Sequence, residues 1–148
     1  GYVSNDVIDN MPRLPDHWSV LESARSNTEF CLVTAPARHF LNSSFTETRT
    51  SRKLEGRPCV LIHSLDAAKL NIEDGSVCEI GNNRGQIIIH AKVFDGLKRG
   101  VLVVESLWPN KSYIGGVGVN SLTGSDPVAP VGGVAFHDNA VWIKPHER

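Results

Sequence analysis

The chain has 148 residues, of which 41% are hydrophobic and 21% charged, as expected for one ordinary globular domain. Its 15 Lys and Arg residues are balanced by 16 Asp and Glu residues, which gives a formal net charge of −1. This balance argues against a protein that binds nucleic acid by neutralising phosphates. No apolar run approaches the roughly 20 residues that cross a bilayer. We therefore expect no nucleic-acid partner and no membrane insertion.

The cysteines favour a reducing compartment. Cys31, Cys59 and Cys78 are widely spaced and form no CxxC pair, so neither a zinc site nor a thioredoxin-like site is indicated. Reduced thiols in a cytosolic core explain them best, and because no secretory signal opens the chain we expect a cytoplasmic protein. Gly1 at the first position and a single methionine, Met11, suggest a fragment of a longer polypeptide or a processed chain.

The composition of the sequence changes near residue 29. Residues 1–28 are polar, contain two closely spaced prolines and show no sustained period, which predicts a linker or irregular arm. We expect the folded domain to occupy residues 29–148. It begins with a short apolar run at 30–34, a predicted buried strand, and continues with a polar loop at 38–57.

The middle of the chain predicts a strand, a short helix and a second strand. Residues 59–63 are rich in β-branched side chains, which favours a strand. Ser64 is a suitable N-cap for a helix that would run to about Leu70, with an acidic residue in its first turn. The following strand is expected at 76–80.

The second half predicts three more strands around a long loop. A turn at 82–85 leads into residues 86–94, whose alternation predicts a strand with one buried face. Residues 101–104 are apolar on both faces and predict a central strand, 109–133 are glycine-rich and loop-like, and 140–144 form the last predicted strand. Six or so short strands with one small helix favour a barrel over a sandwich.

Familiar catalytic motifs are missing from the sequence. It contains no GxxxxGK[ST] phosphate loop, no HExxH zinc motif and no GxSxG nucleophile elbow. Gly116-Val117-Gly118 matches only part of a dinucleotide fingerprint and lacks its strand-to-helix context. These motifs therefore identify no catalytic residue and no metal site in this chain.

Two loops carry an unusual concentration of polar groups. The segment 34–45 follows a strand, and its hydroxyls and backbone amides suit a phosphate or diphosphate, with charge from a cation and an imidazole. On composition alone, a solvated loop with local turn capping is the better explanation. The candidate ligands in this segment are Thr34, Arg38, His39, Asn42 and Ser43.

The second loop, residues 115–127, is rich in glycine, which allows a backbone to approach a ligand closely. Asn120 offers an adjacent donor and acceptor, which match the edge of a guanine or pterin ring. A plain surface turn, with Asp126-Pro127 as its initiator, explains the same residues without a ligand.

Three sequence blocks, taken together in chain order, resemble a known family. They are Thr34 followed by His39-Phe40-Leu41-Asn42-Ser43, the block from His63 to Val77 with its Asp74-Gly75 turn, and Gly118-Val119-Asn120-Ser121-Leu122-Thr123 with Asp126-Pro127. Together they resemble the C-terminal molybdopterin-dinucleotide-binding domain of the dimethyl-sulfoxide-reductase superfamily, with a particular likeness to formate dehydrogenases. The resemblance covers about residues 30–144.

The resemblance implies a mainly β fold, a double-psi β-barrel with one or two short helices. It also implies a domain of a molybdenum or tungsten oxidoreductase that binds and orients the bis-pterin guanine dinucleotide, alongside the remaining domains of the same enzyme. The metal would be held by the cofactor rather than by this chain, and catalysis would need the other domains. By position, Thr34, His39, Ser43 and Asn120 fall where the family contacts the cofactor.

A second hypothesis is a stand-alone double-psi barrel that acts as a protein-interaction module. It needs only the central strand, helix and Asp-Gly turn, and it leaves the two polar loops without a shared purpose. The two hypotheses differ in one geometric expectation: a cofactor-binding domain should bring Thr34, His39 and Asn120 to a common groove.

Overall fold

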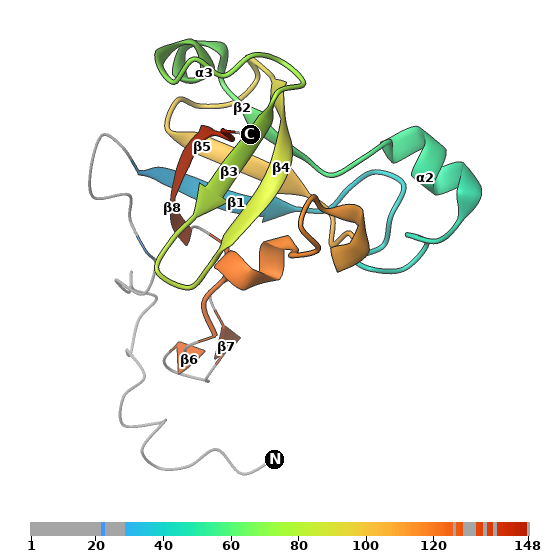
Figure 1. Ribbon diagram of the computed structural model, residues 1–148. Helices are drawn as coiled ribbons and strands as arrows, with labels where there is room; N and C mark the ends of the chain where they lie inside the picture. Colours follow the sequence, from blue (N-terminus) through green and yellow to red (C-terminus); the bar gives the residue numbers. More distant parts are fainter. Residues whose placement is uncertain are drawn as a thin grey trace, which may run out of the picture.

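Six strands form a closed barrel in the computed structural model, which describes residues 22, 29–125, 127–128, 133–134, 136–137 and 139–147 (Figure 1). β8 pairs with both β1 and β3 and so closes the sheet. Around the barrel the strands are β1 (Phe30–Ala35), β5 (Val101–Glu105), β2 (Cys59–Ile62), β4 (Gln86–Val93), β3 (Val77–Gly81) and β8 (Asn139–Pro145).

The direction of pairing defines the type of barrel. β1 runs parallel to β5 and β2 runs parallel to β4, while the other four strand contacts are antiparallel. The two parallel pairs are neighbours in the sheet, because β5 also pairs with β2 in the antiparallel direction. This closed six-strand arrangement with two parallel pairs agrees with the double-psi β-barrel that the family resemblance implies.

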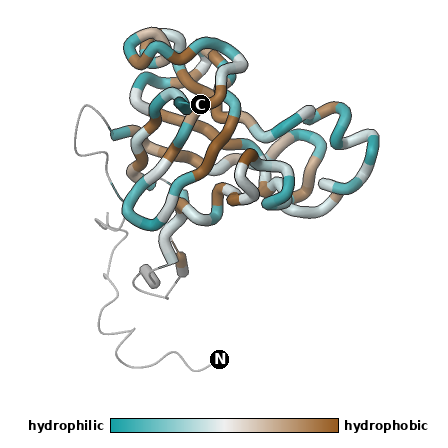
Figure 2. The backbone as a smooth tube through the Cα atoms, in the orientation of Figure 1, coloured by the Kyte–Doolittle hydropathy of each residue, from teal (hydrophilic) through white to brown (hydrophobic). Residues whose placement is uncertain are grey.

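Alternating residues of the strands fill the barrel interior. In β4, Ile87, Ile89 and Ala91 are at most 2% exposed, which confirms the inward face predicted from the alternation. Neighbouring strands do the same with Leu32 of β1 and Leu102 of β5, both fully buried. Figure 2 shows these hydrophobic stretches along the barrel strands. The resulting apolar cluster is the main source of stability for the fold.

A short helix, α3 (Ser64–Lys69), lies at one end of the barrel (Figure 1). The helix was predicted, but its N-cap is His63, whose Nδ1 accepts a hydrogen bond from the backbone of Leu65 at 3.1 Å. An imidazole nitrogen therefore takes the role expected of the Ser64 hydroxyl. Asp66 is buried and accepts from the Gly100 backbone N–H at 2.7 Å, which ties α3 to the turn before β5.

A second helix, α2 (Arg49–Glu55), lies in the segment for which a polar loop was predicted. It buries none of its residues, so it carries no apolar stripe from which a helical period could be read. The helix and its flanking loops project sideways from the barrel (Figure 1). The prediction of a loop throughout 38–57 was wrong, because a helix without an apolar stripe leaves no helical period in the sequence.

The predicted loop at 109–133 contains short elements. It includes two 3₁₀ turns, η1 (Asn110–Ser112) and η2 (Val119–Leu122), and the two-residue strands β6 (Pro127–Val128) and β7 (Gly133–Val134). The predicted arm at 1–28 lies outside the described residues except for Glu22, so the division into arm and domain stays a prediction.

Candidate functional site

A groove of about 660 Å³ opens where β1 and β5 end. Because these two strands are parallel and in register from Cys31 opposite Val101 to Ala35 opposite Glu105, their carboxyl ends meet at the same mouth of the barrel. Ligands of sheets with parallel strands commonly bind at such carboxyl ends. The lining residues come from these strand ends, from the loop after β1, from the η2 segment and from the segment before β8: Thr34, Ala35, Pro36, Asn42, Ser106, Leu107, Asn120, Thr123, Gly124, Val134, Phe136 and His137.

One side of the groove joins the first strand to the last segment of the chain. Oγ1 of Thr34 lies 3.1 Å from Nδ1 of His137, although the two residues are 103 positions apart. The ring of Phe136 lies 4.4 Å from the His137 ring, centroid to centroid. A hydroxyl, an imidazole and an aromatic face are therefore adjacent on this wall.

A second side is formed by two residues in left-handed backbone conformations. Asn42 has φ 52° and Ser106 has φ 72°, a region that asparagine tolerates and serine rarely adopts. Ser106 is buried, donates its backbone N–H to the Ala35 carbonyl at 2.7 Å, and donates its hydroxyl to the Asn42 carbonyl at 3.3 Å. These bonds hold a backbone conformation that costs free energy, a pattern that is frequent at binding sites.

The third side is the η2 turn, which carries Asn120. Val119 and Leu122 are buried beneath it, and the Asn120 side chain is exposed at the groove. A Cβ on Gly118 would lie 2.6 Å from the Asn110 Oδ1 and 3.3 Å from the Tyr113 ring, so this position requires close packing of backbone. Burial raises the pKa of Tyr113 to about 12, with a weaker opposing effect from the neighbouring Val119 backbone amide, so the phenol beneath η2 is neutral.

The sequence-predicted residues divide into two groups. Thr34, Asn42 and Asn120 line the common groove, as expected for Thr34 and Asn120. The expectation that His39 would face the same groove was wrong, because His39 is absent from its lining. His39 faces Glu55 of α2, which accepts from the His39 backbone N–H at 2.6 Å and lies 2.8 Å from its Nδ1.

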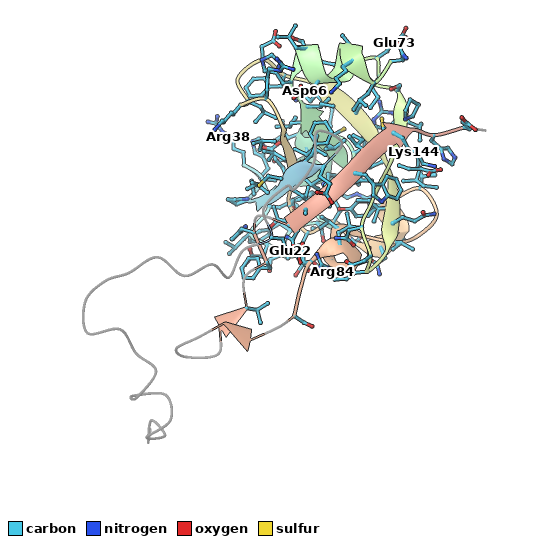
Figure 3. All side chains as sticks on the ribbon, turned by 90° about the vertical axis from the view of Figure 1, so that its left-hand side faces the viewer. Glu22, Arg38, Asp66, Glu73, Arg84 and Lys144 are labelled. Atoms are coloured by element: carbon cyan, nitrogen blue, oxygen red, sulfur yellow. The ribbon has the colours of Figure 1, made fainter. Side chains whose placement is uncertain are left out.

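Two other candidates from the first loop also lie off the described groove lining. The Arg38 side chain is exposed and points outward, as Figure 3 shows. Ser43 is exposed, and its carbonyl accepts from the Thr46 hydroxyl at 2.9 Å. The roles of Arg38, His39 and Ser43 stay predictions.

Sequence reasoning missed Ser106, Leu107 and Thr123 as groove residues. Ser106 carries no motif, but it lies two residues after the predicted central strand at 101–104. The rule that parallel strands place their carboxyl ends together would have singled it out, had the pairing of that strand with the first strand been known.

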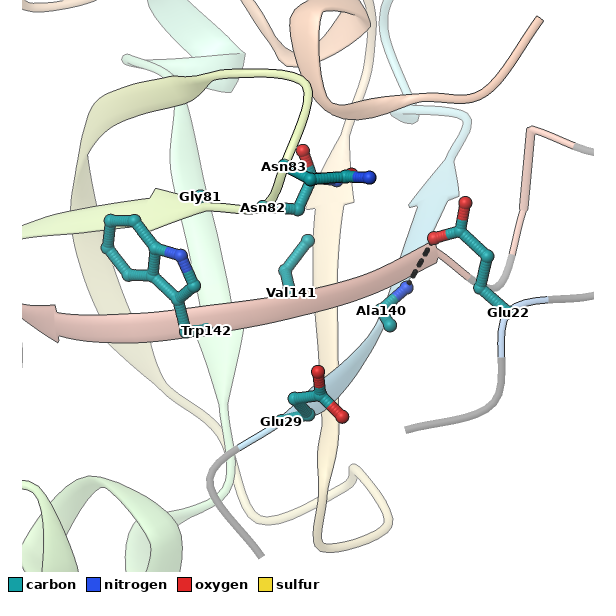
Figure 4. A pocket seen from close by; sticks show the side chains of 8 residues that line it. All are labelled: Glu22, Glu29, Gly81, Asn82, Asn83, Ala140, Val141 and Trp142. Carbon is teal, nitrogen blue, oxygen red and sulfur yellow. Dashed lines mark hydrogen bonds between the residues drawn. The ribbon is translucent and has the colours of Figure 1, made fainter. Parts of the chain in front are cut away.

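A second cavity, of about 610 Å³, lies beside β3 and β8 (Figure 4). It is lined by the carboxylates of Glu22 and Glu29, and Glu22 accepts from the Ala140 backbone N–H at 3.1 Å. Two carboxylates disfavour an anionic ligand here. By contrast, none of the twelve described residues that line the Thr34–Asn120 groove carries a carboxylate.

Comparison with known proteins identifies the family of the chain and supports the fold. Residues 30–141 match the model of the family described as "Molydopterin dinucleotide binding domain", so the chain belongs to this family. Its relatives include the "Probable oxidoreductase YoaE" of Bacillus subtilis, 32% identical over 136 residues, which cover 92% of this chain and 20% of that protein. The "Dimethyl sulfoxide/trimethylamine N-oxide reductase" of Rhodobacter capsulatus is 37% identical over 70 residues, 47% of this chain and 8% of that protein.

Among solved structures, acetylene hydratase from Pelobacter acetylenicus superposes with a TM-score of 0.65 at 14% identity, over 79% of this chain and 18% of that one, which supports the fold. The resemblance to molybdopterin oxidoreductases of the dimethyl-sulfoxide-reductase superfamily is thereby confirmed, while the finer likeness to formate dehydrogenases stays a prediction. The chain spans a fifth or less of these proteins. None of the helices in the described part of the chain is long and apolar enough to cross a bilayer.

Proposed function

We propose that this chain is the C-terminal domain of a molybdenum or tungsten oxidoreductase and that its groove binds and orients a molybdopterin guanine dinucleotide. The observation that carries the proposal is the convergence of Thr34, Asn42 and Asn120 on one groove at the carboxyl ends of β1 and β5. These residues come from two polar loops that lie far apart in the sequence. A shared ligand explains why the fold brings them together.

The groove has the chemistry that such a cofactor requires. The Thr34 hydroxyl and the Asn120 amide can donate to phosphate oxygens or to the polar edge of a ring. The Thr123 hydroxyl donates to the Asn120 carbonyl at 3.1 Å and can accept from a ligand. The absence of carboxylates among the described lining residues avoids repulsion of a diphosphate. Leu107 and Phe136 add apolar surface against which a planar ring can pack. The residues present therefore fit the group.

The chain's own contribution is binding and orientation. When bound, the cofactor supplies the dithiolene sulfurs that hold the metal, and this chain supplies no metal ligand. The proposed contacts are Thr34, Arg38, His39, Asn42, Ser43 and Asn120. Thr34, Asn42 and Asn120 already line the groove, whereas His39 would first have to leave Glu55 and Arg38 would have to turn inward.

The partners we propose are the remaining domains of the same enzyme, which would cover the open side of the groove. The surface of α2 and of the loop before it supports the presence of such partner domains, because Leu41, Phe45 and Leu54 are between 58% and 65% exposed there. Apolar side chains gathered on one projection are typical of surfaces that another domain covers. The free thiols of Cys59 and Cys78 agree with the cytoplasmic location that we propose.

The alternative, a stand-alone barrel that binds other proteins, leaves the groove without a purpose. It predicts no particular relation between the two polar loops. Their meeting at one mouth of the barrel favours the cofactor-binding domain.

Replacement of Asn120 by Ala in the intact protein tests the proposal. The exposed Asn120 side chain supports no described hydrogen bond of the fold, so its loss should change the free energy of unfolding by less than about 0.5 kcal/mol. Loss of two hydrogen bonds to a ligand, at about 0.5–1.5 kcal/mol each, should weaken cofactor binding by about 5-fold to about 150-fold. Metal analysis and chromatography of the released pterin and guanine nucleotide measure the retained cofactor.

Asn83→Ala is the matched control, because Asn83 is an exposed amide that lines the second cavity instead. It should keep the cofactor content of the wild type. If the metal and guanine nucleotide contents are unchanged in both Asn120→Ala and Thr34→Val, the groove does not hold the dinucleotide.

A further inference from the structure

The η2 turn needs support from outside itself. A single 3₁₀ turn is weak because its hydrogen bonds are few and poorly aligned. In η2 the backbone bonds are Ser121 N–H to the Gly118 carbonyl at 3.1 Å and Thr123 N–H to the Asn120 carbonyl at 3.4 Å. The Ser121 and Thr123 hydroxyls donate to the same two carbonyls at 2.9 and 3.1 Å, so all of these bonds stay within the turn and none ties it to the barrel. The position of the Asn120 side chain therefore depends on what holds the ends of this turn.

One backbone carbonyl at the C-terminal end of η2 accepts several hydrogen bonds from outside the turn. The Leu122 carbonyl accepts from Nδ2 of Asn82 at 2.8 Å and from Nε and Nη2 of Arg84 at 3.0 and 2.8 Å. Asn82 and Arg84 belong to the turn between β3 and β4. Oδ1 of Asn82 in turn accepts from the backbone of Arg84 at 2.9 Å, so the donors are set in place before they meet η2.

The other edge of the same guanidinium faces the start of β8. Nη1 and Nη2 of Arg84 donate to the two carboxylate oxygens of Glu22 at 2.5 and 3.0 Å, and Nη2 lies 3.4 Å from Oδ1 of Asn139. Glu22 also accepts from the Ala140 backbone N–H. Figure 3 shows Glu22 and Arg84 together at the end of the molecule opposite Asp66. Arg84 thus joins η2 to the strand that closes the barrel.

This arrangement exceeds an ordinary surface ion pair, whose contribution is commonly below about 1 kcal/mol. Only the planar guanidinium can place donors on a carbonyl along one edge and on a carboxylate along another. A lysine could keep the charge at this position but could satisfy only part of the set.

We propose that Arg84 is a positioning residue that clamps the Leu122 carbonyl and thereby holds Asn120 at the groove. The inference rests on the proposed function, because it assigns Arg84 an indirect role in binding the cofactor. Arg84 is absent from the described groove lining, so it acts through η2 and not by touching the ligand.

Arg84→Lys in the intact protein is the principal test, with Arg99→Lys as control. Arg99 likewise donates Nε to a carboxylate, that of Asp66 at 3.1 Å, at the far end of the barrel. In Arg84→Lys, hydrogen exchange at the Ser121 and Thr123 amides should become at least about 5-fold faster, and cofactor retention should fall at least about 5-fold. Arg99→Lys should change neither quantity.

Exchange at the buried β4 amides shows whether the barrel remains folded. If Arg84→Lys unfolds it, Asn82→Ala, which removes one of the three donors to Leu122, decides the same question by the same two measurements. Unchanged exchange at Ser121 and Thr123 overturns the clamp, whatever the cofactor content. Faster exchange with unchanged cofactor content overturns the positioning role. If Asn120→Ala and Thr34→Val also leave the cofactor content unchanged, the proposed function itself has failed.

Discussion

Replacement of Asn139 by Ala should destabilise the fold and loosen one wall of the groove. Asn139 is 2% exposed at the start of β8. Its Nδ2 donates to the Phe136 carbonyl at 2.7 Å, and its Oδ1 accepts from the Gly124 backbone N–H at 3.2 Å. The substitution would leave two backbone groups without these partners, each at a cost of about 1–3 kcal/mol if water cannot replace them. Since Phe136 itself is 48% exposed, its carbonyl can recruit water, and we expect a total of about 2–4 kcal/mol.

Urea denaturation followed by tryptophan fluorescence measures this loss, because the chain contains three tryptophans. Hydrogen exchange should show the local effect, with faster exchange at the Gly124 amide than in the wild type. Asn83→Ala removes an exposed amide from a turn and should change the free energy of unfolding by less than about 0.5 kcal/mol. If Asn139→Ala is as stable as Asn83→Ala, the buried amide does not anchor the segments on either side of it, and the reasoning is wrong.

Two further predictions concern the barrel itself. Gly81→Ala should lower the free energy of unfolding in the urea titration by about 1–3 kcal/mol, because its Cβ would lie 2.3 Å from Cζ2 of the cross-strand Trp142. Gly96→Ala is the control: its Cβ meets only an exposed phenylalanine ring, and it should lower the free energy of unfolding by less than about 0.5 kcal/mol. Equal losses in the two variants would contradict the prediction. Burial, and then the charge of Arg57, lowers the pKa of His90 from its ordinary 6.5. The folded state therefore binds this proton more weakly than the unfolded state does. As a result, the free energy of unfolding is at its full value above pH 6.5 and declines as the pH falls from there through the folded-state pKa. His90→Gln should flatten this decline in unfolding midpoints measured between about pH 8 and pH 5, and an unaltered slope would exclude His90 as its source.

Local patterns in the sequence predicted most of the barrel strands. The alternation in 86–94 identified both the strand and its buried face, since the period of two is a direct consequence of strand geometry. The parallel pairing of β1 with β5 could not be read in the same way. It joins Cys31 to Val101 across 70 positions, and nothing local in either segment specifies the partner.

The same distinction separates the groove residues that were predicted from those that were not. Thr34 and Asn120 stand out because polar loops next to strands are unusual in composition. His39 was singled out by the same reasoning, but the structure pairs it with Glu55 on α2, a helix without an apolar stripe. Ser106 has no local signal, because its importance arises from a backbone conformation and a parallel strand pair that exist only in the folded chain.

The two ends of the barrel use different side chains to hold backbone N–H groups. At the α3 end the acceptors are aspartates: Asp66 accepts from Gly100, Asp74 from Val93 and Asp95 from Ser64. At the groove end two asparagines and a glutamate accept: Asn82 accepts from Arg84 and Gly85, Asn139 from Gly124, and Glu22 from Ala140.

Either residue type can accept these bonds, and a carboxylate accepts the more strongly. The two asparagines also donate, Asn82 Nδ2 to the Leu122 carbonyl and Asn139 Nδ2 to the Phe136 carbonyl, and a carboxylate cannot do this. A carboxylate at Asn139, behind the groove wall, would repel an anionic ligand through a poorly solvated interior. Glu22 also lies at this end, where its charge is countered by Arg84. Local folding thus requires the amides for their donor as well as their acceptor, and their neutrality also suits the charge of the ligand that we propose.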